Sequence, residues 1–241
     1  MIAARQAIRD MSEVARRYIR SSGRTGLDWA RLELLEASIV AKLLILEHNA
    51  TLLASASLEG LSKLENPFAD AGCPNSVVLI SDDDWDIVVK TPQAGALMRL
   101  MAFSDVVSAC VNAADTLGRF ISVAYDLRLD KDQASLRRIL PKLQSKSRLL
   151  PVLRENPGLD WMEKLRKLRG ECQHGAIVGT IWTVSGANTE PIVGRQFCQG
   201  DGDGVSISTY IGWARAQTIE LITKAASAIA SDLEHGVSQK K

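Results

Sequence analysis

The sequence predicts a mainly α-helical protein, a helical bundle of long antiparallel helices with one small inserted β-hairpin. Apolar residues recur at steps of three and four along residues 4–20, 28–65, 91–127 and 208–233, which is the spacing of one helix face. β-Branched and aromatic runs are instead concentrated in residues 177–198. With 241 residues, of which 46% are hydrophobic and 24% charged, the chain has the composition of a globular protein with a sizeable core.

The first two helices follow from this spacing. Residues 4–20 form one amphipathic stripe that ends at Ser21, Ser22 and Gly23. A longer helix is expected from Asp28 to the break at Asn66 and Pro67. Residues 77–89 fit either a small hairpin or an N-cap leading into one helical turn, and the sequence leaves both open.

The middle of the chain begins with a capped helix. Thr91 precedes Pro92, which is tolerated in a first helical turn, and the helical spacing continues to about Leu127. Two shorter helices are expected around residues 133–140 and 143–154. A further helix starts after Asp160 and stops at Gly175, because glycine commonly ends helices.

The last third of the chain changes character. Residues 177–184 and 192–198 predict a β-hairpin with its turn at residues 186–188, followed by a glycine-rich loop at 200–204. A closing helix spans residues 208–233. The most economical organisation is a single helical domain. Its parts are N-terminal helices at 1–60, a bundle core at 91–175, the hairpin at 176–200 and the closing helix at 206–235.

The net charge of +1 hides a strong separation of charge along the chain. Residues 32–127 hold five basic and thirteen acidic residues, whereas residues 128–169 hold twelve basic and five acidic ones. The basic block leads directly into the helix that starts near residue 160. It could hold a polyanion such as RNA, or it could be the solvated face of short helices or pack against the acidic ones.

Several site classes are disfavoured by the sequence. The loop at 200–204 lacks the ligands of a calcium site and the lysine of a phosphate-binding loop. The four cysteines include no closely spaced pair, so neither a zinc site nor a disulfide framework is expected. We expect no metal, no cofactor, no membrane association and a cytoplasmic location.

Arg169 and His174 are the candidate catalytic residues. A guanidinium binds phosphate through paired N–H donors, and an imidazole with a pKa near neutrality transfers protons, so together they suit metal-independent RNA cleavage. Five positions along a helix separate two side chains by about 140°, so the pair needs the helix end or a second copy to meet. Arg166 and Lys167 are the candidate RNA-binding residues.

At these residues the sequence resembles the HEPN superfamily, whose motif is an Arg followed after four to six residues by a His near the end of a helix. The resemblance implies a dimeric, metal-independent endoribonuclease of a toxin–antitoxin or phage-defence system. In it Arg169 would bind phosphate and His174 would act as acid or base. It also implies RNA as ligand, a homodimer, and an antitoxin or other protein partner. The family usually has Asn, Asp or His after the Arg, whereas this chain has Gly170. The alternative function is a non-catalytic helical interaction module that binds a partner protein or nucleotide.

Overall fold

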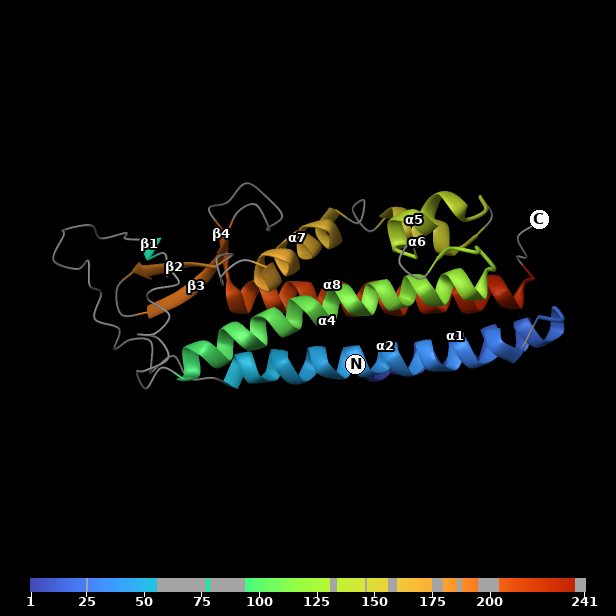
Figure 1. Cartoon of the computed structure of the whole chain (residues 1–241), viewed down its shortest axis with the longest axis horizontal. Helices are drawn as coiled ribbons and strands as arrows, with labels where there is room; N and C mark the ends of the chain where they lie inside the picture. Colours follow the sequence, from blue (N-terminus) through green and yellow to red (C-terminus); the bar gives the residue numbers. More distant parts are fainter. Residues whose placement is uncertain are drawn as a thin grey trace. The chain divides into compact units, whose positions relative to one another are not determined.

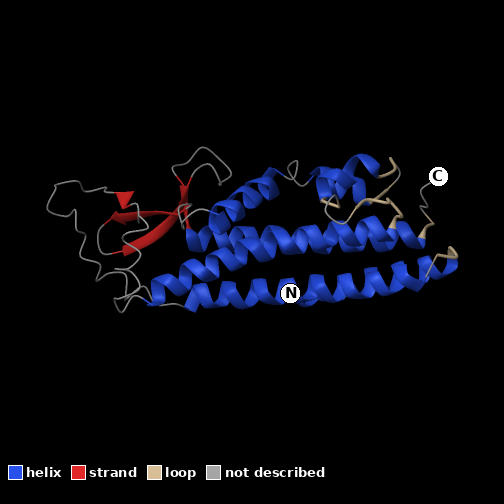
Figure 2. Cartoon of the chain, in the orientation of Figure 1, coloured by secondary structure: helices blue, strands red, loops and turns tan. Residues whose placement is uncertain are grey.

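The computed structural model describes residues 1–24, 26–55, 77–78, 94–130, 134–145, 147–155, 160–174, 180–185, 188–194 and 204–236. Most of these residues are helical (Figure 2), which confirms the mainly α prediction. The chain divides into two compact units. Unit 1 comprises Met1–Ile45, Ala109–Asp160 and Ala216–Lys241, and unit 2 comprises Leu46–Ser108 and Trp161–Arg215.

Figure 1 labels the α-helices in chain order. The helices are α1 (Ile2–Ser21), α2 (Gly26–Ser55), α4 (Ala94–Ala124), α5 (Leu136–Ile139), the 3-10 helix η4 (Leu140–Lys142), α6 (Leu149–Glu155), α7 (Asp160–His174) and α8 (Ile207–Glu234). Helices α1, α2, α4, α7 and α8 lie where the apolar spacing predicts helices. The predicted continuation of α2 to residue 65 and the cap at Thr91 and Pro92 lie outside the described residues.

Helices α1 and α2 of unit 1 pack antiparallel. The Arg16 guanidinium lies 3.5 Å from the Glu36 carboxylate, and Arg20, one turn later in α1, stacks over the ring of Trp29, earlier in α2, at 5.4 Å. The inward face of α2 carries the residues that its spacing predicts, with Leu32, Ile39 and Leu43 fully buried. Their burial, rather than intrinsic propensity, accounts for most of the stability of such helices.

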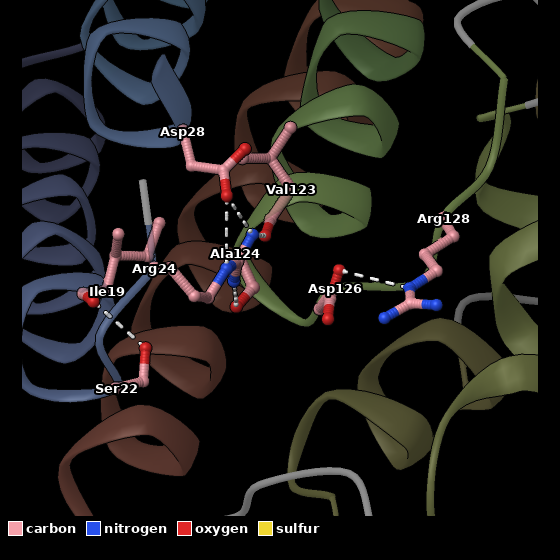
Figure 3. A network of polar contacts seen from close by, with 8 residues as sticks. All are labelled: Ile19, Ser22, Arg24, Asp28, Val123, Ala124, Asp126 and Arg128. Carbon is pink, nitrogen blue, oxygen red and sulfur yellow. Dashed lines mark hydrogen bonds and ion pairs between the residues drawn. The ribbon is translucent and has the colours of Figure 1, made fainter. Parts of the chain in front are cut away.

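The start of α2 lies beside the end of α4. Figure 3 shows the Arg24 guanidinium donating to the carbonyl oxygens of Val123 at 2.7 Å and Ala124 at 3.3 Å while it pairs with the Asp28 carboxylate at 3.1 Å. The last carbonyls of a helix have no partner within it and carry partial negative charge. Arg24 therefore caps α4 from another part of the chain.

Helices α4 and α8 run parallel in unit 1, which differs from the predicted antiparallel arrangement of long helices. Cys110 of α4 hydrogen-bonds Thr218 of α8. In a second hydrogen-bonded pair, Tyr125 follows Cys110 in the sequence and Asp232 follows Thr218, so the two helices run in the same direction. Parallel neighbours need a long connection between the end of one and the start of the next. Residues 125–206 supply that connection, which apolar periodicity alone does not reveal.

Asp232 determines where α6 begins. Its buried carboxylate accepts hydrogen bonds from the Tyr125 hydroxyl at 2.8 Å, the Ser147 hydroxyl at 2.6 Å and the Arg148 backbone N–H at 2.7 Å. The prediction of a helix over 143–154 is wrong at its start, because the helix begins at Leu149, where this carboxylate meets its N-terminal N–H groups. Pro151 is tolerated because it lies in the first turn.

Unit 2 contains an aromatic cluster that joins three helices. Trp161 of α7 contacts Trp213 of α8 with ring centroids 6.0 Å apart, and Tyr210 contacts both Trp213, at 5.4 Å, and Phe103 of α4, at 6.3 Å. The end of α2 in the same unit is tied to α8 by a two-pronged ion pair between Glu47 and Arg215 at 2.6 and 2.8 Å. The start of α7 is thereby fixed in this unit.

The strands of unit 2 are β1 (Val77–Val78), β2 (Thr180–Ser185), β3 (Asn188–Gly194) and β4 (Gly204–Ser206). They pair antiparallel in the order β1-β2-β3-β4, with Thr183 opposite both Val77 and Glu190. Three strand predictions change. Strand β3 begins at Asn188 rather than 192, the loop predicted at 200–204 gives way to β4 at Gly204, and Val77–Val78 pair with β2. Residues 79–89 lie outside the described part of the chain.

Residues Ala102–Ala124 of α4 are, within the described residues, long and apolar enough to cross a membrane by length and composition. In this window, however, 72% is buried inside the protein, as in the central helix of a folded domain.

Candidate functional site

Helix α7 carries all four residues that the sequence singles out as catalytic or RNA-binding. Arg166, Lys167, Arg169 and His174 lie on the single helix Asp160–His174, and His174 is its last residue, as the glycine at 175 predicts. The candidate site is therefore one helix and its C-terminal end.

The apolar face of α7 fixes how this helix is rotated. Trp161, Met162, Leu165 and Leu168 are all fully buried, at steps of one, three and three residues. Side chains three and four apart share a helix face, so Arg169, four residues after Leu165, lies at the edge of the buried face, whereas Lys167 lies opposite it. The local sequence thus directs Lys167, and not a whole basic face, away from the core.

The basic residues of α7 differ in their surroundings. Arg166 is largely covered and its guanidinium pairs with the Glu163 carboxylate at 2.9 Å, one turn earlier on the same helix. Lys167 is exposed, and Arg169 is half-buried. A methyl group added at Gly170 would meet no atom within 4 Å, so the space beside the Arg169 backbone is open. Of the two predicted RNA-binding residues, Lys167 is the more accessible.

Positions 169 and 174 do not share a face of α7. The helix continues without interruption through both, so they differ by about 140° around the axis and about 7.5 Å along it. Within one copy, the structure gives these two positions a common helix but not a common direction.

A second basic surface lies in unit 1 on the short helices α5, η4 and α6. Five of its cationic residues are exposed: Arg137, Arg138, Lys142, Arg148 and Arg154. The Arg148 guanidinium donates to the Ser231 hydroxyl, whereas the buried Asp232 beside it is occupied by hydroxyl and backbone N–H donors. The basic block is therefore solvent-facing here rather than packed against the acidic helices.

Other candidate chemistries gain no support from the described residues. Among them no group of three or more His, Cys, Asp or Glu is placed to hold a metal ion. Burial raises the pKa of the Cys110 thiol to about 12, so it is protonated at neutral pH and unsuited to act as a nucleophile. His48 and His235 are exposed, as the sequence predicts.

Two polar features escape a reading of the sequence. Asp232 and the Glu47–Arg215 pair each join segments more than eighty residues apart, and neither has a local motif. Asp232 lies between Ile229 and Leu233 on the face of α8 that is otherwise apolar and buried. A charged residue at a position where the spacing predicts an apolar one is the signal that could have identified it. Both features stabilise helix positions rather than form a reactive centre.

Comparison with known proteins gives no relative. No protein-family model matches the chain, and neither the curated proteins nor the solved structures contain a significant match.

Proposed function

We propose that this protein is a HEPN-like RNA-binding protein and metal-independent endoribonuclease of a toxin–antitoxin or phage-defence system. Arg169 binds the scissile phosphate and stabilises the charge that develops on it, and His174 moves a proton as the 2′-hydroxyl attacks. Lys167 and Arg166 contact the RNA backbone. The protein acts in the cytoplasm as a homodimer, with an antitoxin or another protein as its partner. Its fold is a HEPN-like bundle with a hairpin inserted after α7.

The observation that carries this proposal is the position of the Arg and His on α7. The helix buries Trp161, Leu165 and Leu168, presents Lys167 to solvent, and ends at His174. An imidazole at a helix C-terminus is favoured in its protonated form, which suits the general acid that protonates a leaving oxygen. The HEPN resemblance gives the same residue an acid or base role.

The 140° between positions 169 and 174 is accommodated by a second copy of the chain. In this arrangement the Arg of each copy works with the His of the other, or two Arg–His pairs converge on one phosphate. The proposal therefore makes cleavage dependent on dimer concentration, since a monomer holds only half of the site.

Cleavage of RNA in the presence of EDTA tests the catalytic part. The wild-type chain should cut single-stranded RNA, and Arg169→Ala and His174→Ala should each lower the rate by at least about 100-fold, as expected for loss of a charge-stabilising group or an acid–base catalyst. Matched controls are Arg5→Ala and His235→Ala, which remove an exposed Arg and an exposed His elsewhere. Equal rates in all five proteins would refute the assignment.

A non-catalytic interaction module is the second candidate, and the exposed cations of unit 1 favour it. Arg137, Arg138 and Arg154 are exposed, and Arg137 and Arg138 lie in the last turn of α5. This function predicts binding of a partner protein or nucleotide without turnover and without any effect of His174→Ala. Combining Arg137→Ala with Arg138→Ala should then weaken binding of an oligonucleotide and reduce its salt dependence by about two phosphate contacts.

A further inference from the structure

Helix α2 has a second apolar face that nothing in the described structure covers. Opposite its buried face, Leu27 is 76% exposed, Leu34 72%, Leu44 48% and Ile45 49%. Single exposed apolar residues are common on protein surfaces, whereas a contiguous row of large ones marks an interaction site. Since all four residues belong to unit 1, the row lies within one compact unit.

The row follows a heptad pattern. Leu27, Leu34 and Ala41 recur every seven residues, and Ala30, Ala37 and Leu44 follow each of them after three. These six residues, here named the α2 seam, are the a and d positions at which two helices pack side by side. Ala37 and Ala41 are exposed and Ala30 is half-buried. A helix with apolar residues on opposite faces has one face for its own core and one for a partner.

We propose that the α2 seam is a homodimer interface in which α2 packs antiparallel against α2 of a second copy. An interface with two-fold symmetry must be complementary to itself. Pairing about a point between residues 35 and 36 places Leu27 opposite Leu44, Leu34 opposite Ala37 and Ala30 opposite Ala41. Each large central side chain then meets a small one, and the alanine pairs allow close approach of the backbones.

Charge supports the same arrangement. The seam itself is free of charge, and the charged residues at its edges are Arg31 and Glu33, both exposed. In the antiparallel register Arg31 lies nearest to Ser38 of the second copy and Glu33 nearest to Val40, so no like charges oppose one another. The antiparallel alignment also opposes the two helix dipoles.

The area of the seam is sufficient for a specific but modest dimer. The exposed parts of its leucines and alanines amount to on the order of 500 Å² per copy, so that two copies bury about 1,000 Å², near the lower limit of specific interfaces. We therefore expect dimerisation in the micromolar range. The ribonuclease proposed above also acts as a dimer, so this inference names a surface for that dimer. The two fail separately, because the seam variants test α2 whereas Arg169→Ala and His174→Ala test α7.

Sedimentation equilibrium of the full chain between about 1 and 200 μM tests the interface. Wild-type protein should be a dimer at the upper end, and Leu34→Glu should raise the dissociation constant by about 100-fold, since each dimer loses two buried leucines. Because Leu34 is exposed, this change should leave the circular dichroism spectrum unaltered. Ala41→Glu is the second seam variant, and Ile2→Glu, at an 86% exposed residue outside the seam, is the matched control. A wild-type monomer at 200 μM, or a dimer unaffected by both seam variants, would overturn the proposal.

Cross-linking tests the direction of pairing. Ala30→Cys and Ala41→Cys proteins, mixed and mildly oxidised, should form a disulfide between positions 30 and 41 that mass spectrometry of the linked peptide identifies. A link between two copies of position 30 would instead show parallel pairing and refute the antiparallel register. If the seam binds lipid vesicles while the protein stays monomeric, its occupant is a membrane and the proposal is wrong.

Discussion

Replacing Asp232 by alanine should destabilise the protein more than any other single change in the polar contacts described above. The carboxylate is fully buried and accepts hydrogen bonds from two hydroxyls and from the backbone N–H groups of Arg148 and, at 3.4 Å, Leu149. Tyr125 and Ser147 hydroxyls can rotate and find other acceptors, whereas a backbone N–H can only donate. Alanine therefore leaves the Arg148 N–H without an acceptor, whereas the Leu149 N–H keeps the Ser147 hydroxyl at 3.2 Å, and it also opens a cavity.

The magnitude follows from these contacts. A hydrogen bond to a charged group contributes about 1.5–3 kcal/mol, and leaving a buried donor unpaired costs about 1–3 kcal/mol. Allowing for hydroxyl rearrangement, Asp232→Ala should lower the free energy of unfolding by about 3–4 kcal/mol, or the melting temperature by roughly 10 °C. Asp232→Asn keeps one carbonyl oxygen for the Arg148 N–H and should cost about half as much.

Urea unfolding followed by far-ultraviolet circular dichroism measures these differences. Asp105→Ala is the matched control, since Asp105 is exposed on α4 and should change stability by less than about 0.5 kcal/mol. The reasoning would be refuted if Asp232→Ala stayed within 1 kcal/mol of wild type. It would also be refuted if Asp232→Asn were as costly as Asp232→Ala, because the cost would then not come from the backbone donors.

Three further predictions concern helices α4 and α8. Gly118→Ala should lower the free energy of unfolding, measured in urea, by at least about 2 kcal/mol, because its new methyl carbon would lie 2.2 Å from a backbone oxygen. Gly212→Ala is the matched control: its methyl group would meet no atom within 4 Å, so it should raise the free energy of unfolding by up to about 1 kcal/mol. Burial raises the pKa of Cys110 to about 12 from its usual 9, so its contribution to stability is present below pH 9 and is lost between pH 9 and 12. The difference in unfolding free energy between wild type and Cys110→Ala should accordingly shrink by about 1.4 kcal/mol per pH unit above 9, and a constant difference would contradict this. Arg24→Ala should lower the melting temperature by roughly 3–6 °C, because the last carbonyls of α4 lose the guanidinium that caps them. If Arg24→Lys lowered the melting temperature more than Arg24→Ala does, capping would not be the cause.

The parts of the fold that the sequence predicts are those determined within a few turns of chain. The apolar spacing of α2 correctly marks Leu32, Ile39 and Leu43 as core residues, because burying a stripe is what makes such a segment helical. The parallel packing of α4 and α8 and the start of α6 depend on contacts such as Tyr125–Asp232, between residues 107 apart. Periodicity carries no information on pairs at that separation.

The same distinction applies to the strands. The sequence locates extended segments on either side of residues 186–187, since β-branched residues and a small-residue turn are local signals. It does not assign Val77–Val78 to β2 or Gly204–Ser206 to β3, because two- and three-residue strands are defined by their partners and not by their own composition.

The candidate site depends both on local sequence signals and on contacts from outside α7. The sequence determines that α7 is a helix, that Leu165 and Leu168 are its buried face, and that it ends at His174. These local features also determine that positions 169 and 174 point about 140° apart. An Arg–His pair on an unbroken helix can therefore act on one phosphate only with help from outside that helix. In the proposed dimer a second copy would supply this help, so a cleavage rate that rises with dimer concentration would distinguish a catalytic α7 from a basic binding surface.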